Sequence, residues 1–327
     1  MNSFSRSHYR YVLVALIVGI ALVGSVVVVR AYTLESLPDN KSYGDFVVGP
    51  GKVEMTLAPG ESKTIELTIS NRLGTDKIFQ VGEEDFVGST DPKSVVTLLG
   101  DDRGPYSLRD YIHISDATLS IPSGKKARLQ VTITVPPNAQ PGGLYGSVLV
   151  STVSNTNGTT TEAGAAATSP IVSRIGTLFF VRVKGDVKES GHVTDFSVAG
   201  GNMLWNEKDP ITFDVSYNND GNVHLDPYGI VTVTNMIGAT VGTIEVEPWF
   251  AMPSSLRFRE VNWHAPFLFG RYVAHASINR GYNNVIDEEE TTFWVIPWKI
   301  LVGILIVIFA ISFLIRFVGK RFKISRK

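Results

Sequence analysis

In the stretch KTIELTIS, residues 63–70, polar and apolar side chains alternate from Thr64 to Ser70. In an extended strand Ile65, Leu67 and Ile69 lie on one face and the polar residues lie on the other. The sequence APGE at residues 58–61 precedes this stretch, and proline next to glycine marks a turn. An amphipathic strand entered from a tight turn is typical of a β-sandwich, in which one face of each sheet packs against the core.

The same arrangement recurs in residues 127–135, ARLQVTITV, which follow the turn PSGK at residues 122–125. Long helical periodicity is absent from the middle of the chain, where further strand-like stretches lie at residues 146–153, 171–183, 211–217, 229–235, 272–278 and 291–295. The sequence therefore predicts an all-β protein with two immunoglobulin-like β-sandwich domains in tandem.

Two polar segments suggest where the domains begin and end. Residues 184–191 form a short polar segment, and we place the domain boundary there. One domain is then predicted at 45–185 and the other at 190–295. Residues 155–170 consist almost wholly of Thr, Ala, Gly, Asn and Ser. We interpret them as a long loop within the first domain, and an interdomain linker is the alternative.

The first hydrophobic segment, residues 11–29, carries no charge and follows Arg6 and Arg10. A basic start followed by an apolar run is typical of a signal peptide, but this run is long enough to cross a bilayer. Residues 1–31 are therefore predicted to be either a cleaved signal peptide or an uncleaved signal anchor.

The second hydrophobic segment predicts a transmembrane helix at residues 296–318 and a basic cytoplasmic tail at 319–327. Trp294, Trp298 and Lys299 stand at its upstream edge, where they are expected to lie at the membrane interface. The expected location is the cell membrane, with the sandwich domains outside. The protein crosses once, or twice with both ends cytoplasmic if the first segment is retained.

Composition excludes several classes of function. The 327 residues include no cysteine, which rules out disulfides and thiolate chemistry, and a cysteine-free extracytoplasmic protein favours a bacterial source. A formal net charge of −1 gives no general attraction to nucleic acid, so no nucleic-acid partner is predicted.

Two segments of the first predicted domain carry a resemblance. Residues 57–71, LAPGESKTIELTISN, and residues 135–146, VPPNAQPGGLYG, resemble the peptidoglycan-binding domain of WxL-interacting proteins. The order of signal segment, two immunoglobulin-like domains, transmembrane helix and basic tail is also similar to that family. Residues 217–229, YNNDGNVHLDPYG, look like a hairpin of related bacterial surface proteins. The resemblance implies a non-enzymatic protein at the cell wall that binds peptidoglycan and partner surface proteins.

Residues with catalytic or metal-binding spacing are missing from the sequence. It has no HExxH pair, no GxSxG nucleophile turn and no phosphate-binding glycine loop, so no catalytic residue, metal or cofactor is predicted. Aromatic residues are the candidate ligand-binding surface: Tyr106 and Tyr111 around one loop, and Trp249 and Phe250 in the second domain. For tryptophan, packing in the core is the alternative.

The sequence thus predicts a non-enzymatic, membrane-anchored cell-surface protein that binds cell-wall glycan, partner surface proteins, or both. One alternative is a wall-active hydrolase that uses acidic loops at residues 83–85, 101–102 and 287–290. The other alternative is an accessory subunit of a membrane complex.

Overall fold

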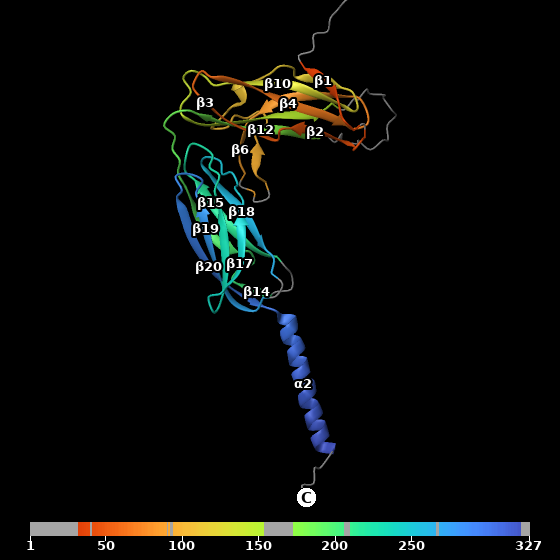
Figure 1. The fold of residues 1–327 in the computed structure, drawn as a ribbon, viewed down its shortest axis with the longest axis vertical. Coiled ribbons are helices and arrows are strands. Elements are labelled where there is room, and N and C mark those ends of the chain that lie inside the picture. The colour runs from red at the N-terminus through yellow and green to blue at the C-terminus, as the bar shows by residue number, and fades with distance from the viewer. Residues whose placement is uncertain are drawn as a thin grey trace, which may run out of the picture.

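The computed structural model describes residues 32–39, 41–89, 91, 94–153, 173–205, 210–265 and 268–321. These residues form two β-sandwich domains and one long C-terminal helix (Figure 1). The prediction of an all-β protein with two tandem sandwiches and a C-terminal apolar helix is confirmed. The predicted signal segment 1–31, the loop 155–170 and most of the basic tail lie outside the described residues.

The first domain packs two five-stranded sheets against each other. In one sheet the strand order is β1-β10-β4-β2, and β8 also pairs with β10. Its strands are β1 Thr33–Ser36, β2 Asp45–Gly49, β4 Ser62–Arg72, β8 Ile112–Ile114 and β10 Lys125–Thr134. The other has the order β3-β12-β11-β5-β9 and consists of β3 Lys52–Leu57, β5 Lys77–Glu84, β9 Thr118–Ile121, β11 Gly142–Thr152 and β12 Arg174–Val183. A short pair, β6 Phe86–Gly88 with β7 Val96–Leu98, and a 3-10 turn, Arg109–Tyr111, complete the domain.

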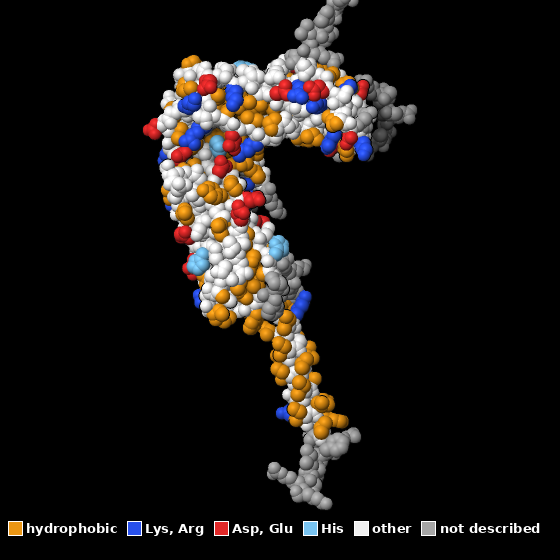
Figure 2. All heavy atoms as spheres, in the orientation of Figure 1, with side chains coloured by type: hydrophobic (Ala, Val, Ile, Leu, Met, Phe, Trp, Pro, Cys, Tyr) orange, Lys and Arg blue, Asp and Glu red, His pale blue; other side chains and the backbone are white. Residues whose placement is uncertain are grey.

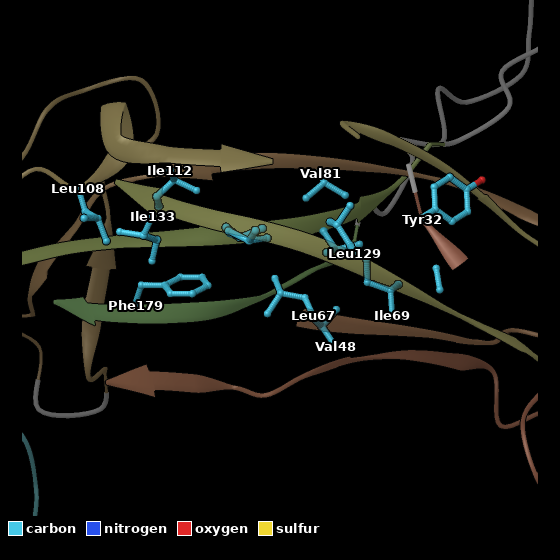
Figure 3. Packing of buried hydrophobic residues seen from close by; sticks show 14 of the residues in the cluster. Tyr32, Val48, Leu67, Ile69, Val81, Leu108, Ile112, Leu129, Ile133 and Phe179 are labelled. Atoms are coloured by element: carbon cyan, nitrogen blue, oxygen red, sulfur yellow. The ribbon is translucent and has the colours of Figure 1, made fainter. Parts of the chain in front are cut away.

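The core of the first domain contains the side chains that the alternation predicts. Leu67 of β4 pairs in register with Leu129 of β10, and both are fully buried. Figure 3 shows them pointing into the space between the sheets together with Ile69, Ile133 and Phe179. Removing such side chains from water provides most of the driving force for folding of a sandwich domain.

The second domain has a three-stranded sheet and a five-stranded sheet. The smaller sheet has the order β13-β15-β18, formed by β13 Gly191–Val198, β15 Ile211–Asn219 and β18 Ser255–Trp263. The larger has the order β14-β20-β19-β16-β17, formed by β14 Met203–Trp205, β16 Tyr228–Asn235, β17 Thr240–Val246, β19 Gly270–Asn279 and β20 Ile286–Ile296.

Both domains use the same connection at their first strands. In the first domain, β2 pairs antiparallel with β4 in one sheet, and β3 then pairs parallel with β12 in the other. In the second domain, β13 pairs antiparallel with β15, and β14 then pairs parallel with β20. The chain therefore crosses from one sheet to the other at an equivalent point in each domain.

A buried asparagine ends the equivalent strand in each domain. The Nδ2 of Asn219, at the end of β15, donates to the carbonyls of Val223 and Ala251, both at 2.9 Å. Its Oδ1 accepts the backbone N–H of Gly221 at 2.8 Å. The amide thus satisfies three backbone groups of two loops that are distant in sequence.

Asn71, at the end of β4, makes the same three hydrogen bonds in the first domain. Its Nδ2 donates to the carbonyls of Thr75 at 2.9 Å and Ile121 at 2.8 Å, and its Oδ1 accepts the N–H of Leu73 at 3.1 Å. The repetition of both the connection and this asparagine shows that the two domains are variations on one plan.

Helix α2, Trp298–Arg321, follows β20 with only Pro297 between them. In the described part of the chain it is the one helix long and apolar enough to cross a membrane, with a mean hydropathy of 2.8 over Trp298–Val318. The side chains of Trp298–Val318 are not buried against the domains, and Figure 1 shows the helix extending away from the second domain.

Candidate functional site between the two domains

An aromatic cluster joins the two domains. Phe86, Tyr145 and Phe180 of the first domain form it with Phe250 and Met252 of the second, and it is separate from both sandwich cores. The Tyr145 ring is fully buried, and its centroid lies 5.6 Å from that of Phe180. Phe180 in turn meets Phe250 edge to face at 5.0 Å. Contacts of this kind add stability beyond the area that they bury, so the two domains are packed together rather than merely tethered.

Hydrogen bonds fix the same joint. The backbone N–H of His224 donates to the Tyr145 hydroxyl at 2.7 Å, and this hydroxyl lies 3.3 Å from Nδ1 of the His224 ring. The N–H of Gly143 donates to the carbonyl of Asn222 at 2.7 Å, and the Asn222 amide donates to the carbonyl of Pro141 at 3.0 Å. The GGLYG and NDGNVH sequences, 142–146 and 219–224, therefore meet at the joint.

The buried Tyr145 side chain requires a glycine at position 143. Burial raises the pKa of the Tyr145 hydroxyl well above its ordinary value, so it stays protonated and remains able both to donate and to accept. A Cβ on Gly143 would lie 1.9 Å from this hydroxyl. Glycine is needed at this position because any side chain would displace the tyrosine.

The other side of the joint depends on a loop held by Asp85. This carboxylate is fully buried and accepts the backbone N–H groups of Gly104 at 3.1 Å, Leu108 at 3.1 Å and Arg109 at 3.0 Å. The loop presents Tyr106, which meets Tyr145 edge to face at 6.1 Å. Asp85 therefore positions one of the aromatic residues at the joint.

Direct polar contacts also cross the joint at this loop. The Tyr106 hydroxyl lies 3.2 Å from the hydroxyl of Ser254, and Arg257 donates to the carbonyl of Ser94 at 3.1 Å. Arg257 is almost fully buried, so its contact is shielded from water.

A cleft of about 520 Å³ opens beside the joint. Acidic and basic side chains line most of it, together with Phe180 and Leu225. The charged or titratable residues of the lining are Glu54, Lys63, Arg182, Glu189, His224 and Asp226. Arg182 pairs with Glu189 at 2.7 Å, so a strand of the first domain and the interdomain segment 184–190 are linked by charge. Such a lining is unlike the mostly apolar pockets that bind small molecules.

Three side chains in this cleft have the chemistry of metal ligands. Atoms of Glu54, His224 and Asp226 lie within 4.8 Å of one another, and a nitrogen with two carboxylates suits zinc or manganese. However, Glu54 forms an ion pair with Lys52, and the His224 ring lies beside the Tyr145 hydroxyl. These contacts account for the cluster, so we assign no metal to it.

The His224 ring makes the joint sensitive to pH. Burial lowers its pKa from the ordinary 6.5, although Asp226 and Glu54 favour the charged form. The unfolded chain therefore binds a proton more readily than the folded protein. We expect the free energy of unfolding to fall as the pH drops below about 6.5, and to level off below the lowered pKa. Urea unfolding at several pH values should show this dependence in the native protein and not in His224→Gln.

The predicted ligand-binding tyrosines do share one surface feature. Tyr106 and Tyr111 both line a second cleft of about 500 Å³, bounded by residues 136–144 and by Asn222. Both rings are half-buried, Tyr106 in the joint and Tyr111 against the first core. Their assignment as ligand-binding residues stays a prediction.

Trp249 is buried and Phe250 is half-buried, and their assignment as ligand-binding residues of the second domain stays a prediction. Trp249 is only 5% exposed and packs in the second core, 6.3 Å from the ring of Tyr217. Phe250 packs on Phe180 within the joint. Their irregular, proline-flanked sequence context resembles an exposed loop, and only the tertiary structure shows that these rings turn inward.

The acidic loops do not form a common site. Asp85 is structural, and Glu84 pairs with Arg174. Asp101 is fully exposed and lies 3.8 Å from Arg109. The third cluster lies in the other domain, where Asp287 pairs with Arg280. A glycosidase needs two carboxylates facing one substrate, and these clusters do not provide such a pair.

The predicted membrane-interface residues lie at the junction of β20 and α2. Trp294 and Trp298 are 46% and 39% exposed, and Lys299 lies over the Trp298 ring at 5.8 Å. Their position agrees with an interfacial role, which stays a prediction.

Comparison with known proteins gives only distant similarities. No family model matches the chain. No curated protein matches it either. A chaperone–tip adhesin complex of CFA/I fimbriae is 10% identical, covering 77% of this chain and 99% of that chain, with a TM-score of 0.37. The CupB2 chaperone of Pseudomonas aeruginosa is 12% identical, covering 76% and 100%, with a TM-score of 0.34.

A third similar structure, the CsuC–CsuE chaperone–tip adhesion subunit complex of Acinetobacter baumannii, is 11% identical over 77% of this chain and 99% of that chain, with a TM-score of 0.35. These three structures are of fimbrial chaperones and not of WxL-interacting proteins, so the family resemblance inferred from residues 57–71 and 135–146 is wrong. The expectation of a non-enzymatic protein agrees with them. At these low scores they assign neither a partner nor an activity to this chain.

Proposed function

We propose that the chain is a non-enzymatic, membrane-tethered protein that binds a charged segment of another extracytoplasmic protein in the cleft between its domains. The observation that carries this proposal is the joint itself. Because Tyr145 and Phe180 pack directly against the second domain, the cleft beside them has a defined shape in the unbound protein. A preformed site loses less conformational entropy on binding than a flexible one.

The lining of the cleft indicates the class of partner. Lys63 and Arg182 supply positive charge, while Glu54, Glu189 and Asp226 supply negative charge. A peptide segment that carries charges of both signs complements such a surface, and charge complementarity of this kind provides specificity. Arg182 and Glu189 pair with each other and Glu54 pairs with Lys52, so Lys63 and Asp226 are the charged lining residues most available to a partner. A charged protein segment therefore fits this lining better than a cell-wall glycan does.

The tether is supported by α2 and its flanks. The apolar length Trp298–Val318 is sufficient to cross a bilayer, and basic residues follow it in the sequence up to Lys327. Positive charge beside a transmembrane helix favours the cytoplasmic side. In this orientation both sandwich domains lie outside the membrane, with the second domain nearer to it.

A photo-crosslinking amino acid placed at Lys63 in the full chain, in its native membrane, tests the proposal. Lys63 is exposed in the cleft, and Lys41, exposed beyond the opposite end of β4, is the matched control. We expect a discrete protein adduct from position 63, none from position 41, and loss of the adduct in Asp226→Lys. No adduct at position 63, or the same adduct at both positions, would contradict cleft binding.

A further inference from the structure

We propose that the end of the second domain next to α2 is a membrane-contact surface that inserts apolar side chains among lipid headgroups. This inference rests on the proposed membrane tether. The surface, called the rim below, consists of Met203, Met236, Ile237, Phe269 and Trp294.

Members of the rim are unusually exposed for apolar residues. Ile237 is 81% exposed and Met236 is 62% exposed, and the other three range from 46% to 55%. Single exposed apolar side chains are common on soluble domains. A group of large ones at one end of a domain instead marks an interaction site.

Strand pairing brings the rim together from separate segments. Met203 of β14 lies in register with Trp294 of β20. Trp294 in turn pairs with Arg271 of β19, which follows Phe269 and Gly270. The Met236 side chain reaches Gly270, because a Cβ added there would lie 2.5 Å from its methyl carbon. All members therefore lie at one end of the five-stranded sheet, and Figure 2 shows apolar side chains gathered where the helix leaves the domain.

The start of α2 determines how far this end lies from the bilayer. The apolar stretch begins at Trp298, only two residues after β20 ends at Ile296. Its 21 residues span about 31 Å at the rise of an α-helix, which matches a hydrocarbon core of about 30 Å. The headgroup layer adds roughly 5–7 Å on each side. Trp294 precedes Trp298 by four residues, at most about 13 Å of extended chain, so the rim lies within reach of this layer where the last strand is tilted toward the bilayer.

The chemistry of the rim suits that layer. Tryptophan favours the headgroup region, and Ile, Met and Phe gain from entering the boundary of the acyl chains. Arg271 is exposed beside Trp294, and Lys299 follows on the helix. The long side chains of both residues can extend toward lipid phosphates. A lipid surface accounts for apolar and cationic side chains at one end of a domain that leads directly into an apolar helix.

The absence of cysteine allows a direct test by single-site labelling. Ile237→Cys, in the full chain reconstituted in phospholipid nanodiscs, would carry an environment-sensitive fluorophore. Quenching by lipids spin-labelled near the headgroup would be compared with quenching by iodide in water. Ile230→Cys is the matched control, since Ile230 is an exposed isoleucine on β16 of the same hairpin, about 17 Å along the strand from its end at Asn235.

At position 237 we expect lipid quenching at least threefold stronger than at 230, with iodide quenching correspondingly weaker. Equal iodide quenching at the two positions, or shielding at 237 without lipid quenching, would overturn the proposed membrane contact. A third label, Ile308→Cys in the middle of α2, is read with lipids spin-labelled near the end of the acyl chain and separates this inference from the tether. If lipid fails to quench position 308, the membrane tether fails, and if it quenches 308 but not 237, only the rim fails.

Discussion

Replacement of Asp85 by alanine is expected to lower the free energy of unfolding by about 4 kcal/mol. Its fully buried carboxylate accepts three backbone N–H groups, from Gly104, Leu108 and Arg109. Removing it leaves one buried and two partly buried donors without an acceptor, and hydrogen bonds to a charged group are the stronger kind. Because the loop also presents Tyr106, the variant should loosen the joint as well. Denaturant unfolding of the full chain in detergent, followed by tryptophan fluorescence, measures the loss.

Asp102 provides the matched control for Asp85, since it is an exposed aspartate near the same loop. Asp102→Ala should change the free energy of unfolding by no more than about 0.5 kcal/mol. Equal effects of the two substitutions would show that the buried hydrogen bonds of Asp85 contribute little. That outcome would also favour a functional role for the acidic residues 83–85 over a structural one.

Asn219→Ala is expected to destabilise the second domain by about 3 kcal/mol. The substitution removes both donors that bind the carbonyls of Val223 and Ala251 and the acceptor for the N–H of Gly221. All three groups are buried, so water cannot replace the amide without rearrangement of the loops. Urea unfolding of the full chain is again the measurement.

The neighbour Asn218 is the control for this second substitution. Its amide donates to the exposed Asp220 carboxylate, so Asn218→Ala should cost well under 1 kcal/mol. Asn71→Ala should reproduce the large effect in the first domain, because Asn71 makes the equivalent hydrogen bonds. A small loss for both Asn219 and Asn71 would contradict the structural role of this repeated amide.

The fold was largely predictable because its signal is local. Alternation at residues 63–70 and 127–135 predicts which side chains face the core, and Leu67 and Leu129 are fully buried as expected. The apolar run after Trp298 likewise predicts α2 from length and composition. In both cases a period or a run of residues carries the information.

The joint was not predictable in the same way. The GGLYG sequence has the composition of a turn, and nothing local shows that the Tyr145 hydroxyl meets His224, which lies 79 residues away. Likewise, three consecutive acids at 83–85 do not show that Asp85 alone turns inward. Turn-like segments shared with another family led to an incorrect resemblance, because one of them serves a contact between domains in this protein.

We expect the two domains to form one rigid unit with a preformed cleft. Spin labels are attached at Gln80→Cys and Thr243→Cys, which are exposed strand positions of the first and second domains. The distance between the two labels is measured on the full chain by pulsed electron paramagnetic resonance. We expect a single narrow distance distribution that broadens in Tyr145→Ala. A broad distribution in the otherwise native protein would show that the domains move independently, and would contradict both the joint and the cleft.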